Sequence, residues 1–222
     1  MIGGASVASR LHASGPADRI FFGGMGLAML LTVFAGFAAT YYLRPPGAKP
    51  LTLLLQVHGL TLTAWILLFV VQTALISIRR ADLHRSLGVG GIVLAMAVTV
   101  FATWVAIVDR GLTDQLIFPA GAILMFVIFV TAGWITRRQP GAHKRLMLLA
   151  TVSLLPPAIA RLHLPFLPHD SVGPNVGGLF FLAPPLVYDL VTRRSVHPAL
   201  LWGGIFMAAM VPLRVFFRDF VL

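Results

Sequence analysis

The chain has 222 residues, of which 58% are hydrophobic and only 11% are charged. Soluble domains carry about 45–50% apolar and about 25% charged residues, so this composition excludes both a soluble fold and a disordered chain. The formal net charge is +10, and the absence of cysteine excludes disulfides, iron–sulfur clusters and thiolate metal sites.

Seven apolar stretches are candidates for membrane-spanning helices, which need about 20 residues to cross about 30 Å of hydrocarbon. In chain order they cover residues 20–42, 51–78, 87–108, 115–136, 146–164, 176–192 and 199–217. The fifth and sixth are short and are interrupted by the proline pairs Pro156-Pro157 and Pro184-Pro185. The sequence therefore predicts an all-α, polytopic transmembrane bundle of seven spans. Residues 20–222 form one domain, and residues 1–19 form an N-terminal segment.

The positive charges indicate how the spans are oriented. Eleven Lys and Arg residues lie in the N-terminal segment or in the loops after the second, fourth and sixth spans, and six lie on the other side. Because positive residues collect in the cytoplasm, we expect a cytoplasmic N-terminus and an external C-terminus, in a bacterial inner (cytoplasmic) membrane. Contact with the lipid bilayer then accounts for the basic charge, and nucleic acid is not an expected partner.

The three arginine-rich loops share one pattern, in which two arginines end a helix and a histidine begins the next. The arginine pairs are Arg79-Arg80, Arg137-Arg138 and Arg193-Arg194, and the histidines are His84, His143 and His197. One interpretation is three helical hairpins whose arginines snorkel to the headgroups. The other is that the histidines converge to bind a metal or an anionic headgroup, or act as a proton-sensitive latch. Both stay open, because the distance between loops is a tertiary property.

The second span carries a polar stripe. His58, Thr61, Trp65 and Gln72 follow one another at offsets that keep them near one face of a helix. An ionisable group at membrane depth is costly and is a functional candidate by default. The stripe is either an interhelical hydrogen-bond seam or part of a ligand or cofactor site.

Two further histidines fall on the same outer side as His58, since His163 ends the fifth span and His169 lies in the loop after it. Neutral imidazoles suit haem iron, copper or zinc. We therefore expect haem b or a transition metal to bind through His58 with His163 or His169, in a membrane redox, electron-transfer or sensor role that could involve quinone. The expected cofactor-binding set is His58, His163, His169, Arg161, Trp65 and Gln72.

Two other functions stay open. The proline pairs deprive the carbonyls of Val152, Ser153, Phe180 and Phe181 of their helical partners. The result is either two ordinary kinks or the wall of a cavity for an amphipathic or lipid-like ligand, in a carrier or receptor. The minimal loops also fit a non-enzymatic subunit or assembly partner of a larger membrane complex. Motifs of conventional soluble-substrate enzymes are absent, so an enzymatic role stays undecided and would be that of a membrane oxidoreductase component.

Parts of the chain resemble a family of bacterial integral membrane proteins of unknown function with a loop of the LHRxLG type. The resemblance rests on residues 58–72, which begin HGL, on LHRSLG at 83–88, and on HKRLM at 143–147 with the later Arg161. It covers residues 50–165 and implies no particular activity. It does point to His58, His84 and His143 as the histidines of interest.

Overall fold

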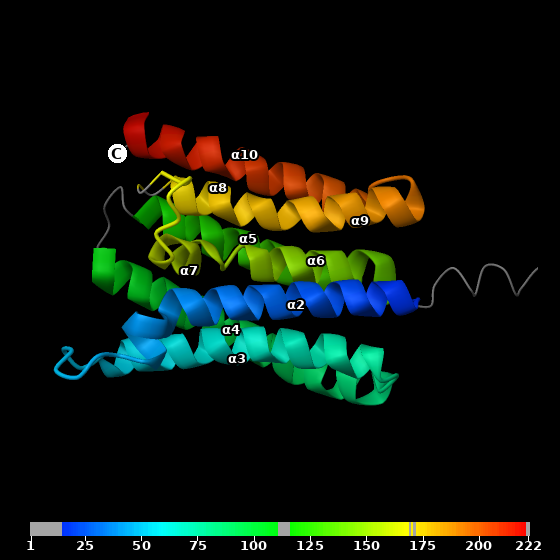
Figure 1. Ribbon diagram of the computed structural model, residues 1–222, viewed down its shortest axis with the longest axis horizontal. Coiled ribbons are helices and arrows are strands. Elements are labelled where there is room, and N and C mark those ends of the chain that lie inside the picture. The colour runs from blue at the N-terminus through cyan, green and yellow to red at the C-terminus, as the bar shows by residue number, and fades with distance from the viewer. Residues whose placement is uncertain (1–14, 111–115, 169, 171, 221–222) are drawn as a thin grey trace, which may run out of the picture.

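The computed structural model describes residues 15–110, 116–168, 170 and 172–220, and the regular structure in this part of the chain is helical throughout. The elements are α2 (Pro16–Phe37), the π-helix η1 (Ala38–Tyr42), α3 (Leu53–Ser77), α4 (Ala81–Arg110), α5 (Ile117–Ile135), α6 (Pro140–Val152), α7 (Pro156–Arg161), α8 (Gly173–Leu179), the 3₁₀ turn η3 (Phe180–Leu182), α9 (Ala183–Arg193) and α10 (Pro198–Phe220). They run side by side along the long axis of the molecule (Figure 1). This confirms the predicted all-α helical bundle.

Six segments of the described chain are long and apolar enough to cross a membrane. They are α2 with η1, α3, α4, α5, the run from α8 to α9, and α10. Large apolar side chains such as Leu31, Val93 and Phe216 are exposed on them, as expected where lipid surrounds the protein. The chain is therefore a multi-pass membrane protein, while the count of seven spans and their direction stay predictions.

The fifth predicted span is two short helices. α6 begins at Pro140, six residues before the predicted start, and α7 continues in the same direction after a break at 153–155 (Figure 1). Pro156 lies in the first turn of α7, where its missing N–H costs nothing. The Val152 carbonyl accepts from the Leu155 N–H at 3.1 Å, and the Phe180 carbonyl likewise accepts from the Ala183 N–H. These two carbonyls are therefore satisfied by tight turns.

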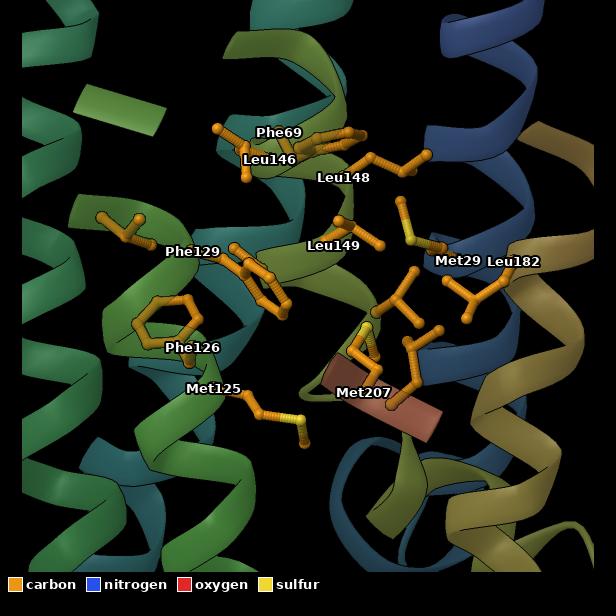
Figure 2. Close-up of a cluster of buried hydrophobic side chains, with 14 of the residues drawn as sticks. Met29, Phe69, Met125, Phe126, Phe129, Leu146, Leu148, Leu149, Leu182 and Met207 are labelled. Carbon is orange, nitrogen blue, oxygen red and sulfur yellow. The ribbon is translucent and has the colours of Figure 1, made fainter. Parts of the chain in front are cut away.

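The core of the bundle is built around α6. Leu148, Leu149 and Val152 are fully buried, and side chains from α2, α5 and α10 gather against this helix (Figure 2). In a membrane, van der Waals packing rather than the hydrophobic effect holds such helices together. Packing of this kind stabilises α6 although the helix is short, because α6 contacts neighbouring helices on every side.

A buried ion pair joins α6 to α9. Arg145 and Asp189 are 1% and 0% exposed, and the Arg145 Nε donates to the Asp189 Oδ2 at 2.9 Å. A second bond joins the Arg145 Nη2 to the Asp189 Oδ1, and the backbone N–H of His197 also donates to this carboxylate at 3.0 Å. Asp189 therefore fixes the turn between α9 and α10 as well as α6.

The three loops that carry the arginine pairs lie at one end of the bundle, where α3, α5 and α9 end and α4, α6 and α10 begin (Figure 1). We call this the arginine-rich end and define it by residues 79–80, 137–138 and 193–194. α2 also begins there, whereas α10 ends at the opposite end (Figure 1). The arginine-rich loops thus lie together at one end of the bundle, as the sequence predicts.

Candidate functional site

A cavity of about 820 Å³ lies at the arginine-rich end, between α2, α3, α4 and α6. It extends from the turns at that end to Trp65, which is twelve residues before the end of α3. Twelve residues correspond to about 18 Å along a helix axis. The cavity therefore reaches from the end of the bundle to well inside its membrane-spanning part.

The deep part of the cavity wall is aromatic. Trp65 and Phe69 contribute to it from α3, and both are buried. The Trp65 indole N–H donates to the Thr151 hydroxyl at 3.3 Å, which fixes the ring against α6. This part of the wall offers a rigid apolar surface to a ring or an acyl chain.

The part of the wall nearest the turns is strongly basic. We call this group the cationic rim, and it consists of Arg19, Arg85, Arg137, Arg138 and Lys144. One carboxylate, that of Asp18, accompanies these cations among the described wall residues. Its oxygens lie 2.8 Å from the Lys144 Nζ and accept from the Tyr188 hydroxyl at 2.8 Å. The wall thus carries an excess of positive charge, which favours an anionic group.

Two of the three loop histidines meet in this wall. The rings of His84 and His143 are edge-to-face, with centroids 6.1 Å apart. The His143 Nδ1 lies 2.8 Å from the Gly133 carbonyl, and the Gln72 amide nitrogen donates to the His84 carbonyl at 3.1 Å. The Nδ1 of His84 and the Oε1 of Gln72 are both buried without a hydrogen-bond partner. Buried polar atoms of this kind are rare and call for a physical explanation.

His197 does not line the cavity. Its Nδ1 accepts from the Ala199 N–H at 3.1 Å, at the start of α10. Burial, together with the nearby charges of Arg145 and Arg193, holds the pKa of His197 below its ordinary value and favours the neutral ring that this bond requires. The structure thus brings His84 and His143 together and gives His197 a separate role at a helix start.

The polar stripe of α3 divides between two places. Trp65 and Gln72 line the cavity, whereas His58 lies near the start of α3 and toward the opposite end. The Nδ1 of His58 is buried and has no hydrogen-bond partner. The Thr61 hydroxyl bonds back to the His58 carbonyl at 2.8 Å, so it serves the helix itself.

Two other members of the expected cofactor set, Arg161 and His163, lie near the end of α7. The Arg161 Nη1 donates to the Pro157 carbonyl at 2.7 Å, and its guanidinium lies 4.4 Å from the centroid of the Phe37 ring. His163 is exposed, and its Nδ1 lies 2.9 Å from the Arg161 carbonyl. His169 lies outside the described residues. Within the described part of the chain, no three or more His, Cys, Asp or Glu residues form a group that could hold a metal ion.

Sequence reasoning missed the cavity itself. One alternative for the proline pairs was a ligand cavity at the fifth and sixth spans, whereas the observed cavity is bounded by α2, α3, α4 and α6. Two features of the sequence indicated the cavity. Gln72 and His84 lie on consecutive helices joined by a short turn, and arginines cluster in the same loops. Comparison of the chain with protein-family models, curated proteins and solved structures finds no match.

Proposed function

We propose that this protein binds an amphipathic anionic ligand, such as an acidic lipid, in the cavity at its arginine-rich end. The observation that carries the proposal is the combination, in one cavity, of a cationic rim and a deep aromatic wall. The volume also falls within the range of about 300–1,000 Å³ typical of small-molecule sites. The function is that of a membrane carrier or receptor.

The orientation of the ligand follows from the order of the groups along the bundle. The arginines lie at the end of the bundle, while Trp65 lies deeper among the helices. An anionic headgroup would contact the cationic rim and leave its apolar body on the aromatic wall. Basic sites between transmembrane helices on the cytoplasmic side recognise acidic headgroups in the same way. The proposal thus includes a cytoplasmic arginine-rich end in a bacterial inner membrane.

Native mass spectrometry of the detergent-purified protein tests this proposal. Phosphatidylglycerol and phosphatidylcholine with identical acyl chains are compared, and the anionic lipid is expected to bind more tightly. Arg85→Gln should weaken phosphatidylglycerol binding about fivefold, since one cation near the surface contributes about 1 kcal/mol. Arg79→Gln is the matched control, because Arg79 is exposed at the same end but does not line the cavity. Equal binding of the two lipids, or equal effects of the two variants, would contradict the proposal.

A second candidate function is the binding of haem b or a transition metal at His58. It is favoured by the buried, unpartnered Nδ1 of that histidine. Ultraviolet–visible spectroscopy and elemental analysis of purified protein test it. The expected result is a Soret band or a bound metal that is lost in His58→Ala. A folded, colourless and metal-free preparation would eliminate this candidate without affecting the lipid proposal.

A further inference from the structure

The cationic rim carries more positive charge than the carboxylates of the cavity wall can balance. Asp18, the one carboxylate among the described wall residues, is paired with Lys144. The ion pairs found in the described part of the chain do not include Arg85, Arg137 or Arg138. A ligand with a single negative charge would therefore leave most of this positive charge unbalanced.

Two of these arginines are anchored in a way that leaves N–H groups for a ligand. The Arg85 Nε donates to the Ala81 carbonyl at 3.1 Å, and the Arg137 Nη1 donates to the Trp134 carbonyl at 3.0 Å. The Arg137 guanidinium also lies 4.6 Å from the centroid of the Trp134 ring, which lines the same cavity. A guanidinium has several N–H donors in a planar fork, so one bond to the backbone orients the group and leaves most of its donors available.

The two anchored arginines belong to different elements that meet at the cavity. Arg85 lies near the start of α4, whereas Arg137 lies in the turn between α5 and α6. The edge-to-face contact of His84 with His143, whose ring centroids are 6.1 Å apart, joins the start of α4 to the start of α6. The first residue of each of these helices lines the cavity, so the positive ends of two helix dipoles add to the attraction of an anion.

We infer that the headgroup bound at the cationic rim is a phosphate monoester. The inference rests on the proposed lipid binding and names the class of the headgroup. A phosphate monoester has three acceptor oxygens and carries close to two negative charges above pH 7, whereas a phosphodiester carries a single charge. Guanidiniums bind phosphate oxygens in pairs, so a monoester can accept from Arg85 and Arg137 while its apolar body stays on the deep aromatic wall.

Competition between two lipids at two pH values tests this inference. Phosphatidic acid, a monoester, and phosphatidylglycerol, a phosphodiester, are supplied with identical acyl chains, and the bound ratio is measured by native mass spectrometry in detergent. The second pKa of a phosphate monoester is about 6, so phosphatidic acid carries its second charge at pH 8 and not at pH 5. We expect phosphatidic acid to bind about fivefold more tightly at pH 8, the contribution of about one further charge contact, and equally at pH 5.

The ratio isolates the second charge of the headgroup from the titration of the protein. The titratable groups of the described wall are His84, His143, Asp18, Lys144 and the rim arginines. Any change in their charge between pH 5 and pH 8 acts on both lipids and cancels in the ratio. The difference in headgroup size between the two lipids is also the same at both pH values.

Arg137→Gln should lower the preference for phosphatidic acid at pH 8 from about fivefold to about twofold, because one oriented guanidinium is lost. Arg79→Gln is the matched control, since Arg79 is exposed at the same end but does not line the cavity, and it should keep the full preference. Glycerol 3-phosphate has the same headgroup without acyl chains. It should displace phosphatidic acid only at concentrations at least about 100-fold higher, because it leaves the apolar wall unfilled.

Equal binding of phosphatidic acid and phosphatidylglycerol at pH 8, or an unchanged preference at pH 5, would overturn the inference. Tighter binding of phosphatidylglycerol than of phosphatidylcholine would still support the proposed lipid binding in that case. Displacement by glycerol 3-phosphate at equal concentration would show that the ligand is a soluble phosphate ester and would overturn the assignment to a lipid. The pH comparison uses the wild-type protein, so it decides the question even if Arg137→Gln does not fold.

Discussion

Replacement of Asp189 by Asn is expected to lower the free energy of unfolding by about 3–5 kcal/mol. The change keeps the shape of the side chain but removes the charge that balances Arg145. Arg145 is 1% exposed and lies in the most buried helix of the bundle, so water cannot take over the lost interaction. A buried ion pair contributes little net stability. A single buried charge left without its partner, however, destabilises the protein strongly.

Thermal and chemical unfolding in detergent, followed by circular dichroism, measures this loss. The control is Asp82→Asn, which removes a carboxylate paired at 3.0 Å with Arg80 on the surface. The side chains of that pair are 52% and 61% exposed, so its loss should leave the unfolding midpoint unchanged. Similar effects of the two substitutions would show that the Arg145–Asp189 pair is not buried as described.

Replacement of Gly36 by Ala is expected to destabilise the protein by about 1–3 kcal/mol, through overpacking between α2 and α7. A methyl group on Gly36 would clash with the Ala158 carbonyl oxygen and lie 2.8 Å from its carbon. Both atoms belong to the backbone, so neither can move aside as a flexible side chain could. The helices would have to separate at the point where α7 closes the bundle.

Gly24→Ala is the matched control on the same helix, because a methyl group there meets nothing within 4 Å. Alanine is favoured over glycine inside a helix by about 0.8–1.0 kcal/mol, so this substitution should be neutral or stabilising. The two changes are chemically identical, but only Gly36→Ala is expected to lower the unfolding midpoint. A stabilising effect of Gly36→Ala would contradict the close approach of α2 and α7.

The bundle was predictable because the membrane restricts the chain to helices and makes their apolar length visible in the sequence. The same reasoning was less successful for the fifth span. There the hydropathy extends through residues 146–164, whereas the structure has α6 and α7 with a turn between them. Proline positions indicated the break, but the central packing of α6 depends on contacts with several other helices.

The site was predictable only in part, because its residues come from different helices. The shared loop pattern singled out His84, His143 and His197 but could not show which of them meet. The structure joins His84 to His143 and leaves His197 at the start of α10. It also adds Gln72, which the sequence analysis assigned to the same cofactor site as His58, although the two residues lie at opposite ends of the polar stripe. Helical periodicity places residues on one face, whereas the depth of a cavity follows from how the faces pack.

The most direct test of ligand binding in the cavity is photo-crosslinking in bacterial membranes. A phosphatidylglycerol analogue with a photoactivatable group in its acyl chain is added, and the labelled peptides are identified by mass spectrometry. We predict labelling of the α3 segment from Trp65 to Ile76 and of α4 near Gly88, both of which line the cavity. Excess unlabelled phosphatidylglycerol and the Arg85→Gln substitution should both reduce this labelling. Labelling confined to outward-facing residues such as Leu31 and Val93, and unaffected by competition, would contradict the presence of a ligand in the cavity.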